Sequence, residues 1–129
     1  MNKLVLPAKG SISGFGGGLE DSTTFFSFTN FVTPRKIYEI DLSDMSTKTF
    51  WEESLDGYNA DQYISEFKFY PSKDGAMIPI HISYKKSLNI NENTPILIYG
   101  YGGFNISILP NFSKRFLSWM NQDGVVAVA

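Results

Sequence analysis

The sequence predicts a mixed fold, in which a β-rich first half precedes an α/β second half. Short strands separated by polar turns follow one another from about residue 10 to residue 57, a pattern typical of a meander or of one β-propeller blade. The chain then closes with a strand, a helix and a strand, which make up half of a βαβ arrangement. The 129 residues are 43% hydrophobic and 16% aromatic, which indicates a folded globular protein.

The first half contains an alternating run at residues 23–31, with Phe26, Phe28 and Asn30 on one face. The Thr33-Pro34 pair interrupts this run, and residues 36–41 and 47–51 are the next candidate strands. A single propeller blade cannot bury both of its faces alone, so we expect such a unit to need neighbours.

The second half opens with a predicted hairpin of residues 63–70 and 77–84, whose turn carries an Asp-Gly signal. Pro79 favours an edge position for the returning strand, because a missing N–H is harmless there. Residues 96–98 are a continuous apolar run, which predicts a buried parallel strand. Residues 111–121 have the pattern of an amphipathic helix with Asn111 as its N-cap.

The last five residues read as another buried strand, from Val125 to Ala129. A chain end usually lies at the surface, often in polar sequence. The apolar end therefore leads us to expect that the 129 residues are a fragment of a longer polypeptide.

The stretch from Tyr99 to Gly103 contains the candidate catalytic groups of the sequence. Ligands of α/β sheets gather at the carboxyl ends of strands, and glycines allow the backbone to turn sharply and to approach a bound group. The hydroxyl groups of Tyr99 and Tyr101 can each donate a hydrogen bond, and such a donor stabilises negative charge developing on a substrate oxygen. An ordinary strand-end turn accounts for the same residue types equally well.

Composition excludes several classes of function. A net charge of −2 provides no basic field for nucleic acid or for an anionic membrane, and the absence of cysteine excludes disulfides and thiol catalysis. One histidine and no cysteine argue against a zinc site, and we expect neither a metal nor a cofactor. Pro7 interrupts the N-terminal stretch before the apolar core of a signal peptide could form. No apolar stretch approaches the ~18 residues that span a bilayer, so we expect a cytoplasmic protein.

Other candidate motifs favour structural roles. Ile12 stands where a nucleophile elbow needs serine, so we interpret Ser11 and Ser13 as turn residues. The glycines at positions 14–18 lack the remaining residues of a phosphate loop and predict a flexible turn. His81 sits within a predicted strand, with no acid nearby in sequence to fix its tautomer, and we assign it a structural role.

Four stretches of the sequence resemble the prolyl oligopeptidase family of serine peptidases, which cut short peptides after proline. Residues 70–75 and 99–107 (Tyr-Gly-Tyr-Gly-Gly-Phe-Asn-Ile-Ser) are similar to the start of its catalytic domain, and residues 10–14 and 28–34 are similar to its last propeller segment. The resemblance implies the C-terminal part of a β-propeller in residues 1–57 and the N-terminal part of an α/β-hydrolase domain in residues 58–129.

The resemblance also implies roles for particular residues. By residue match, Tyr101 donates its hydroxyl to the oxyanion hole, beside the backbone N–H that follows the nucleophilic serine, and Phe104 lines the pocket for the substrate proline. The family's serine, aspartate and histidine match no residue here, so we expect the 129-residue chain to be inactive alone. The implied parent is a monomer acting on short proline-containing peptides.

Two alternatives remain open at this point. An oligopeptidase B-like enzyme, which cuts after basic residues, shares the tyrosine-glycine block in outline. A truncated, β-rich interaction module without catalysis would instead be a soluble, cooperative monomer or dimer.

Overall fold

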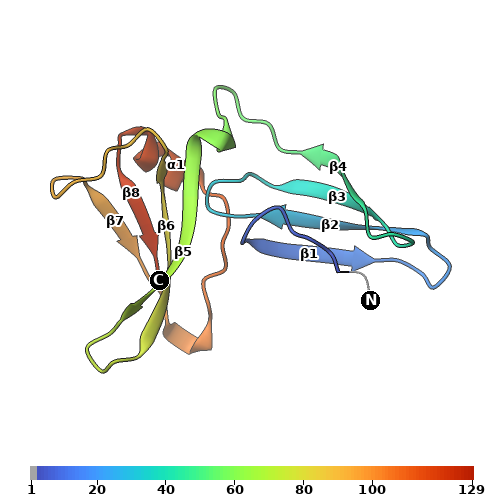
Figure 1. Cartoon of the computed structure of the whole chain (residues 1–129), viewed down its shortest axis with the longest axis horizontal. Coiled ribbons are helices and arrows are strands. Elements are labelled where there is room, and N and C mark those ends of the chain that lie inside the picture. The colour runs from blue at the N-terminus through green and yellow to red at the C-terminus, as the bar shows by residue number, and fades with distance from the viewer. Residues whose placement is uncertain (1–2) are drawn as a thin grey trace. The chain divides into compact units, whose positions relative to one another are not determined.

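Two sheets of four strands each organise the chain, which we describe over residues 3–129 from a computed structural model (Figure 1). The sheets belong to two units. The first unit holds the described residues up to Tyr58 together with Pro110–Phe112, and the second holds Asn59–Leu109 and Ser113–Ala129. Residues 1 and 2, with which the first predicted domain begins, lie outside the described residues.

The first sheet is an antiparallel meander of β1 (Ser11–Gly16), β2 (Thr23–Thr29), β3 (Lys36–Asp41) and β4 (Thr47–Glu52), in that spatial order. The strands predicted at residues 23–31, 36–41 and 47–51 are confirmed. Its core lies on the predicted face of β2, where Phe26 and Phe28 are buried with Ile40 of β3. The ring of Phe26 is stacked between the rings of Phe15 and Tyr38, at centroid distances of 5.5 and 5.1 Å.

A buried asparagine closes the first unit's turn after β2. Asn30 is buried, and its side-chain oxygen accepts hydrogen bonds from the backbone N–H groups of Val32 and Thr33, at 2.9 and 2.7 Å. The side chain satisfies backbone donors that the end of the strand would leave unpaired, which accounts for a polar residue on the core face.

The interpretation of Ser11 and Ser13 as turn residues is wrong, and of the glycines predicted to form a turn only Gly17 and Gly18 lie in the connection between β1 and β2. Both serines lie in β1, and this strand continues to Gly16. The register shifts between Gly14 and Gly16, and Gly14 has a φ of 124°. A Cβ on Gly14 would lie 2.7 Å from the backbone oxygen of Phe25, so glycine permits a β-bulge against β2 here.

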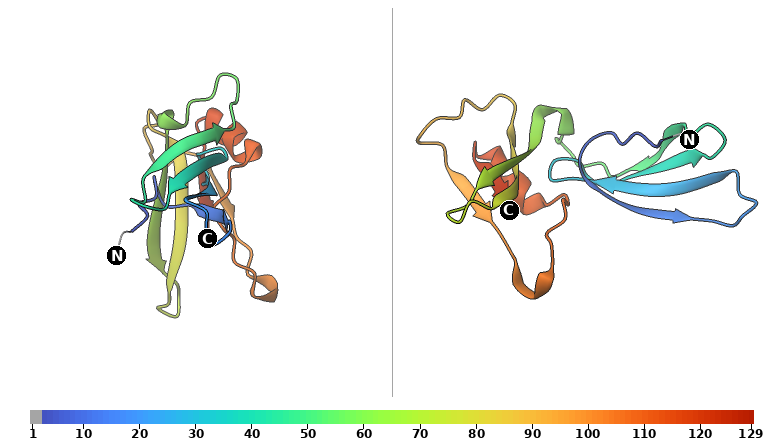
Figure 2. Two further views of the ribbon diagram at one scale, coloured as in Figure 1. Left: turned by 90° about the vertical axis from the view of Figure 1, so that its right-hand side faces the viewer. Right: turned by 60° about the horizontal axis from the view of Figure 1, so that its bottom comes forward.

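The second sheet contains β5 (Tyr63–Pro71), β6 (Met77–Lys85), β7 (Ile96–Tyr99) and β8 (Val125–Val128), in the order β5-β6-β8-β7. A short 3-10 helix, η1 (Ala60–Gln62), precedes it. The predicted hairpin of β5 and β6 is confirmed, as is the strand–helix–strand at the end, because β7 and β8 pair in parallel and α1 (Lys114–Asn121) connects them. Helix α1 packs on β8 and β6, as Figure 2 shows.

Three details of the second unit differ from the predictions. Strand β7 is an edge strand with exposed Ile96 and Ile98, and it is therefore not buried. Strand β6 is internal, although its pairing with β8 ends at His81, short of Pro79. Helix α1 begins after Ser113 and not after Asn111, because the preceding residues are bonded to the first unit.

None of the helices in residues 3–129 is long and apolar enough to cross a membrane.

Candidate functional site

The tyrosine-glycine block forms the loop that leaves the carboxyl end of β7. The last backbone hydrogen bond at the end of the β7–β8 pairing runs from the N–H of Ala129 to the carbonyl of Tyr99, at 3.0 Å. Beyond it the chain leaves the sheet. A short turn, η2 (Gly103–Asn105), follows. In Figure 2 the segment after β7 loops out beyond the sheet before it returns to α1.

The two tyrosines of the block have different surroundings. The ring of Tyr99 lies 6.3 Å from the ring of Phe116 on α1, so this side chain packs on the helix. Tyr101 lies past the strand end and is 47% exposed. A Cβ built on Gly103 would lie 3.2 Å from the Tyr101 hydroxyl oxygen, which shows that the phenol folds back over this glycine. Tyr99 is 48% exposed, so both phenol groups reach the surface and exposure does not separate the two tyrosines.

Phe104 holds an unusual backbone conformation. Its φ and ψ angles are 57° and 25°, and Asn105 also has a positive φ of 56°. Left-handed conformations of residues other than glycine cost of the order of 1–3 kcal/mol each and cluster at functional sites. The Phe104 side chain is 92% exposed, so the other described residues do not enclose its ring.

The far end of the loop is bonded within the first unit. The Ser11 hydroxyl donates to the carbonyl of Pro110 at 2.6 Å, and the backbone N–H of Phe112 donates to the Thr29 hydroxyl at 3.3 Å. The rings of Tyr58 and Phe112 lie 5.5 Å apart. Sequence reasoning missed these contacts, because residues almost a hundred positions apart give no local signal of pairing.

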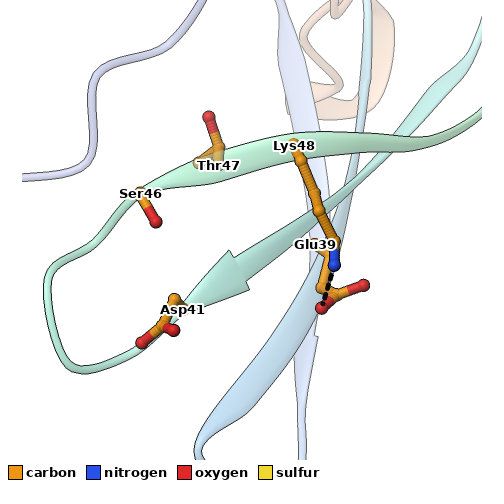
Figure 3. Close-up of a pocket in the computed structure, with 5 residues that line it drawn as sticks. All are labelled: Glu39, Asp41, Ser46, Thr47 and Lys48. Carbon is orange, nitrogen blue, oxygen red and sulfur yellow. Dashed lines mark ion pairs between the residues drawn. The ribbon is translucent and has the colours of Figure 1, made fainter.

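Other polar groups have structural explanations. The hollow in Figure 3 is lined by Glu39, Asp41 and Lys48, with Ser46 and Thr47. An ion pair of 3.0 Å joins Glu39 to Lys48, and hydrogen bonds from Ser43 hold the pKa of Asp41 below its usual value. These contacts stabilise the β3–β4 turn.

A second polar cluster lies on the β5–β6 hairpin. The Tyr84 hydroxyl donates to Glu66, whose other carboxylate oxygen is paired with Lys68. Burial raises the pKa of Tyr84, and the hydrogen bond from Lys68 lowers the pKa of Glu66. The cluster is a cross-strand pairing on the sheet surface.

His81 and the metal-binding residue types offer no second site. The His81 ring lies 4.8 Å from the ring of Phe67 on the neighbouring strand β5. Within residues 3–129, no group of three His, Asp or Glu side chains could hold a metal ion.

Comparison with known proteins identifies the relatives of this chain. Residues 1–53 match the family described as the N-terminal β-propeller domain of prolyl oligopeptidase. The prolyl endopeptidase of Elizabethkingia meningoseptica is 40% identical over 123 residues, which are 95% of this chain and 17% of that protein. The chain belongs to the prolyl oligopeptidase family. Its meander fits the N-terminal β-propeller domain of that family.

Solved prolyl oligopeptidases share the structure. One from a study of two prolyl endopeptidases superposes with a TM-score of 0.84 at 36% identity, over 99% of this chain and 19% of that chain. Prolyl oligopeptidase B from Galerina marginata superposes with a TM-score of 0.85 at 26% identity, over 99% and 19% of the two chains. The chain spans 17–18% of the two Elizabethkingia prolyl endopeptidases that it matches.

Proposed function

We propose that this chain contributes the oxyanion donor and part of the substrate pocket to a serine endopeptidase that cuts short peptides on the carboxyl side of proline. The observation that carries the proposal is the position of Tyr101 in the loop between β7 and α1. Strand β7 is the third strand of the second sheet in chain order. In α/β-hydrolases, the loop after the third strand supplies one donor of the oxyanion hole.

The same position supports the two-domain assignment. We propose that residues 1–57 are the C-terminal part of the β-propeller and that residues 58–129 are the N-terminal part of an α/β-hydrolase domain. The parallel β7–β8 pair with its α1 crossover is the connection typical of such sheets.

The chemistry of the Tyr101 hydroxyl suits the role. A tetrahedral intermediate of peptide hydrolysis carries oxygen charge that the ground state lacks, so a fixed donor stabilises the transition state selectively. Tyr101 donates from a turn that keeps its hydroxyl close to Gly103. Phe104 presents an exposed, flat apolar ring, which suits a pyrrolidine ring that has no N–H to satisfy.

The nucleophile and its base are proposed to come from residues beyond these 129. The only histidine, His81, packs on Phe67 within the sheet. The Ser11 hydroxyl donates to a backbone carbonyl, and the Ser13 hydroxyl is hydrogen-bonded to Ser27. Since nucleophilic serine needs an adjacent base, the isolated 129-residue chain is expected to leave proline peptides intact.

An oligopeptidase B-like activity is the second candidate, because oligopeptidase B from Leishmania major superposes with a TM-score of 0.74 at 27% identity. The prolyl branch is favoured by the higher identity of 40% to a prolyl endopeptidase. The cytoplasmic location and the monomeric state remain predictions.

The experiment is to purify the gene's natural product with an antibody against residues 107–121 and to treat it with a fluorophosphonate. Labelling, together with cleavage of a chromogenic peptide after proline and not after arginine, is the expected result. Cleavage after arginine would establish the second candidate, and a protein that neither reacts nor cleaves would be the interaction module.

A further inference from the structure

Three aspartates of this chain are followed directly by glycine: Asp56, Asp74 and Asp123. In an Asp-Gly pair the backbone nitrogen of the glycine can attack the side-chain carboxyl group, because glycine has no side chain to hinder the approach. The ring that forms opens to isoaspartate, in which the main chain runs through the former side chain. Both the carboxyl group and the glycine nitrogen must leave their partners to react, so the hydrogen bonds of each pair decide where the reaction occurs.

The pair of Asp74 and Gly75 is held on both sides. The Asp74 carboxylate accepts hydrogen bonds from the Ser72 hydroxyl and from the backbone N–H of Ala76, the latter at 3.1 Å. The N–H of Gly75 donates to the Ser72 carbonyl at 3.0 Å. The hydrogen bond from the Ser72 hydroxyl also lowers the pKa of Asp74, so less of the reactive, protonated carboxyl group is present at neutral pH.

The pair of Asp123 and Gly124 is held in a different way. The Asp123 carboxylate is paired with Lys85 at 3.3 Å, and the N–H of Gly124 donates to the Trp119 carbonyl at 3.2 Å. Gly124 is buried, and the Trp119 ring occupies the space beside it. The nitrogen of Gly124 therefore cannot reach the carboxylate without loss of these contacts.

The pair of Asp56 and Gly57, in the first unit, has neither restraint. It occupies the two central positions of a turn, which the Tyr58 N–H closes by donating to the Leu55 carbonyl at 3.1 Å. Gly57 has a φ of 71°, and a positive φ at this position is typical of a type II turn. Both residues of the pair are exposed, and within residues 3–129 neither the Asp56 carboxylate nor the Gly57 N–H has a hydrogen-bond or ion-pair partner. Beyond its chain neighbours, no described atom lies within 4 Å of a Cβ built on Gly57, which leaves room for the ring.

We propose that Asp56 is a site of spontaneous isomerisation to isoaspartate, and that the fold protects Asp74 and Asp123 from the same reaction. The Gly57 nitrogen forms a bond to Cγ of the protonated Asp56 carboxyl group, and the hydroxyl group leaves as water with the proton of the nitrogen. Water then opens the succinimide ring. Its attack on the Cγ carbonyl restores aspartate, and its attack on the main-chain carbonyl gives isoaspartate. One water is released and one is taken up, so the reaction needs no co-reactant.

The product changes the turn in which it forms. Isoaspartate at position 56 places Cβ in the main chain, so the backbone between Leu55 and Gly57 becomes one carbon longer. The hydrogen bond from the Tyr58 N–H to the Leu55 carbonyl spans this segment and is weakened by the change. Because the reaction requires no enzyme, the modification accumulates with the age of the molecule.

The experiment incubates the gene's complete product at neutral pH, in buffer and in urea, and measures isoaspartate at each of the three pairs. A protease that cleaves before aspartate but not before isoaspartate, followed by mass spectrometry, separates the isomers. Each lost hydrogen bond slows ring closure by about 2- to 10-fold, so Asp56 should isomerise about 4- to 100-fold faster than Asp74 in buffer. Asp123 should also react more slowly than Asp56, and in urea the three rates should converge.

Two results would overturn the proposal. Equal rates in buffer, or faster conversion at Asp74 or Asp123, would show that the unbonded turn does not select Asp56. An equally large difference between the pairs in urea would show that the neighbouring sequence, and not the fold, selects the site.

Two glycine variants control for the chemistry. Gly57→Ala places a methyl group beside the attacking nitrogen and should suppress isomerisation at Asp56. Gly75→Ala makes the same change at a glycine with a φ of 86° and equally open surroundings, and should leave the rate at Asp56 unchanged. Undiminished conversion at Asp56 in Gly57→Ala would overturn the proposed attack by the Gly57 nitrogen.

Discussion

Gly124→Ala is expected to destabilise the second unit, because the space beside Gly124 is already occupied. A Cβ on Gly124 would lie 2.3 Å from Nε1 of Trp119 and 2.6 Å from Cδ1 of the same ring. The Trp119 indole N–H donates to the Val125 carbonyl at 3.0 Å, so the ring cannot withdraw without losing this bond. Gly124 is buried at the point where the chain enters β8.

Opposing effects determine how much Gly124→Ala changes the free energy of unfolding. Overpacking costs about 1–3 kcal/mol, and loss of the indole hydrogen bond costs about 1 kcal/mol. Replacing glycine by alanine also restricts the unfolded chain, which stabilises by about 0.4–1 kcal/mol. The free energy of unfolding should therefore fall by about 1–3 kcal/mol, a sizeable share of the 5–15 kcal/mol typical of a native protein.

Urea unfolding followed by tryptophan fluorescence measures this change. Trp119 reports on the second unit, and Trp51→Phe removes the signal of β4 in the first unit. Gly102→Ala is the control, because nothing lies within 4 Å of its Cβ and its φ is −132°. An unchanged urea midpoint for Gly124→Ala would refute the packing of Trp119 on Gly124.

Three further predictions concern the loop and the hairpin. Gly103→Ala should lower peptide turnover, since the new Cβ would lie 3.2 Å from the Tyr101 hydroxyl oxygen, whereas steady-state kinetics should show little effect of Gly102→Ala. Phe104→Ala should raise KM for a proline peptide more than it lowers kcat, and an unchanged KM would contradict a pocket role. Asp74→Asn should destabilise the β5–β6 hairpin at neutral pH. A hydrogen bond from the Ser72 hydroxyl lowers the pKa of Asp74 from its usual 3.8. The ionised carboxylate therefore stabilises the folded chain above pH 3.8, and this stabilisation is lost as the pH falls through the lowered pKa. Thermal melts of the unmodified protein and of Asp74→Asn at pH 7 and pH 2.5 check this prediction. A difference in melting temperature that is the same at both pH values would contradict it.

Alternation and turn chemistry predicted most of the strands. Phe26 and Phe28 recur at the period of a pleated strand, and both are buried in the meander. The Asp74-Gly75 pair predicted the hairpin, where Gly75 has a φ of 86°.

The errors arise where long-range pairing decides the local structure. The glycine-rich run at residues 14–16 looks like a turn, and only the neighbouring β2 makes it a bulged strand. Asn111 has the residue type of an N-cap, but it belongs to the first unit, and α1 begins only after Ser113. The apolar run of β7 predicted burial, yet exposure depends on which elements cover the strand.

The candidate site depended on two kinds of information. The glycines and tyrosines predicted a functional turn at a strand end, but residue types alone did not separate Tyr99 from Tyr101. The resemblance favoured Tyr101, and the structure adds only that Tyr99 packs on α1, because the two tyrosines are about equally exposed. The role of Tyr101 remains a prediction.

The most direct test of that role is the kcat of Tyr101→Phe, with Tyr99→Phe as control, in the complete gene product on a chromogenic proline peptide. Each variant removes one hydroxyl and keeps the ring. Losing an oxyanion donor should lower kcat by about 10²–10³-fold for Tyr101→Phe and leave Tyr99→Phe close to the unmodified enzyme. Equal kcat values for the two variants would contradict the assignment of Tyr101 as the oxyanion donor.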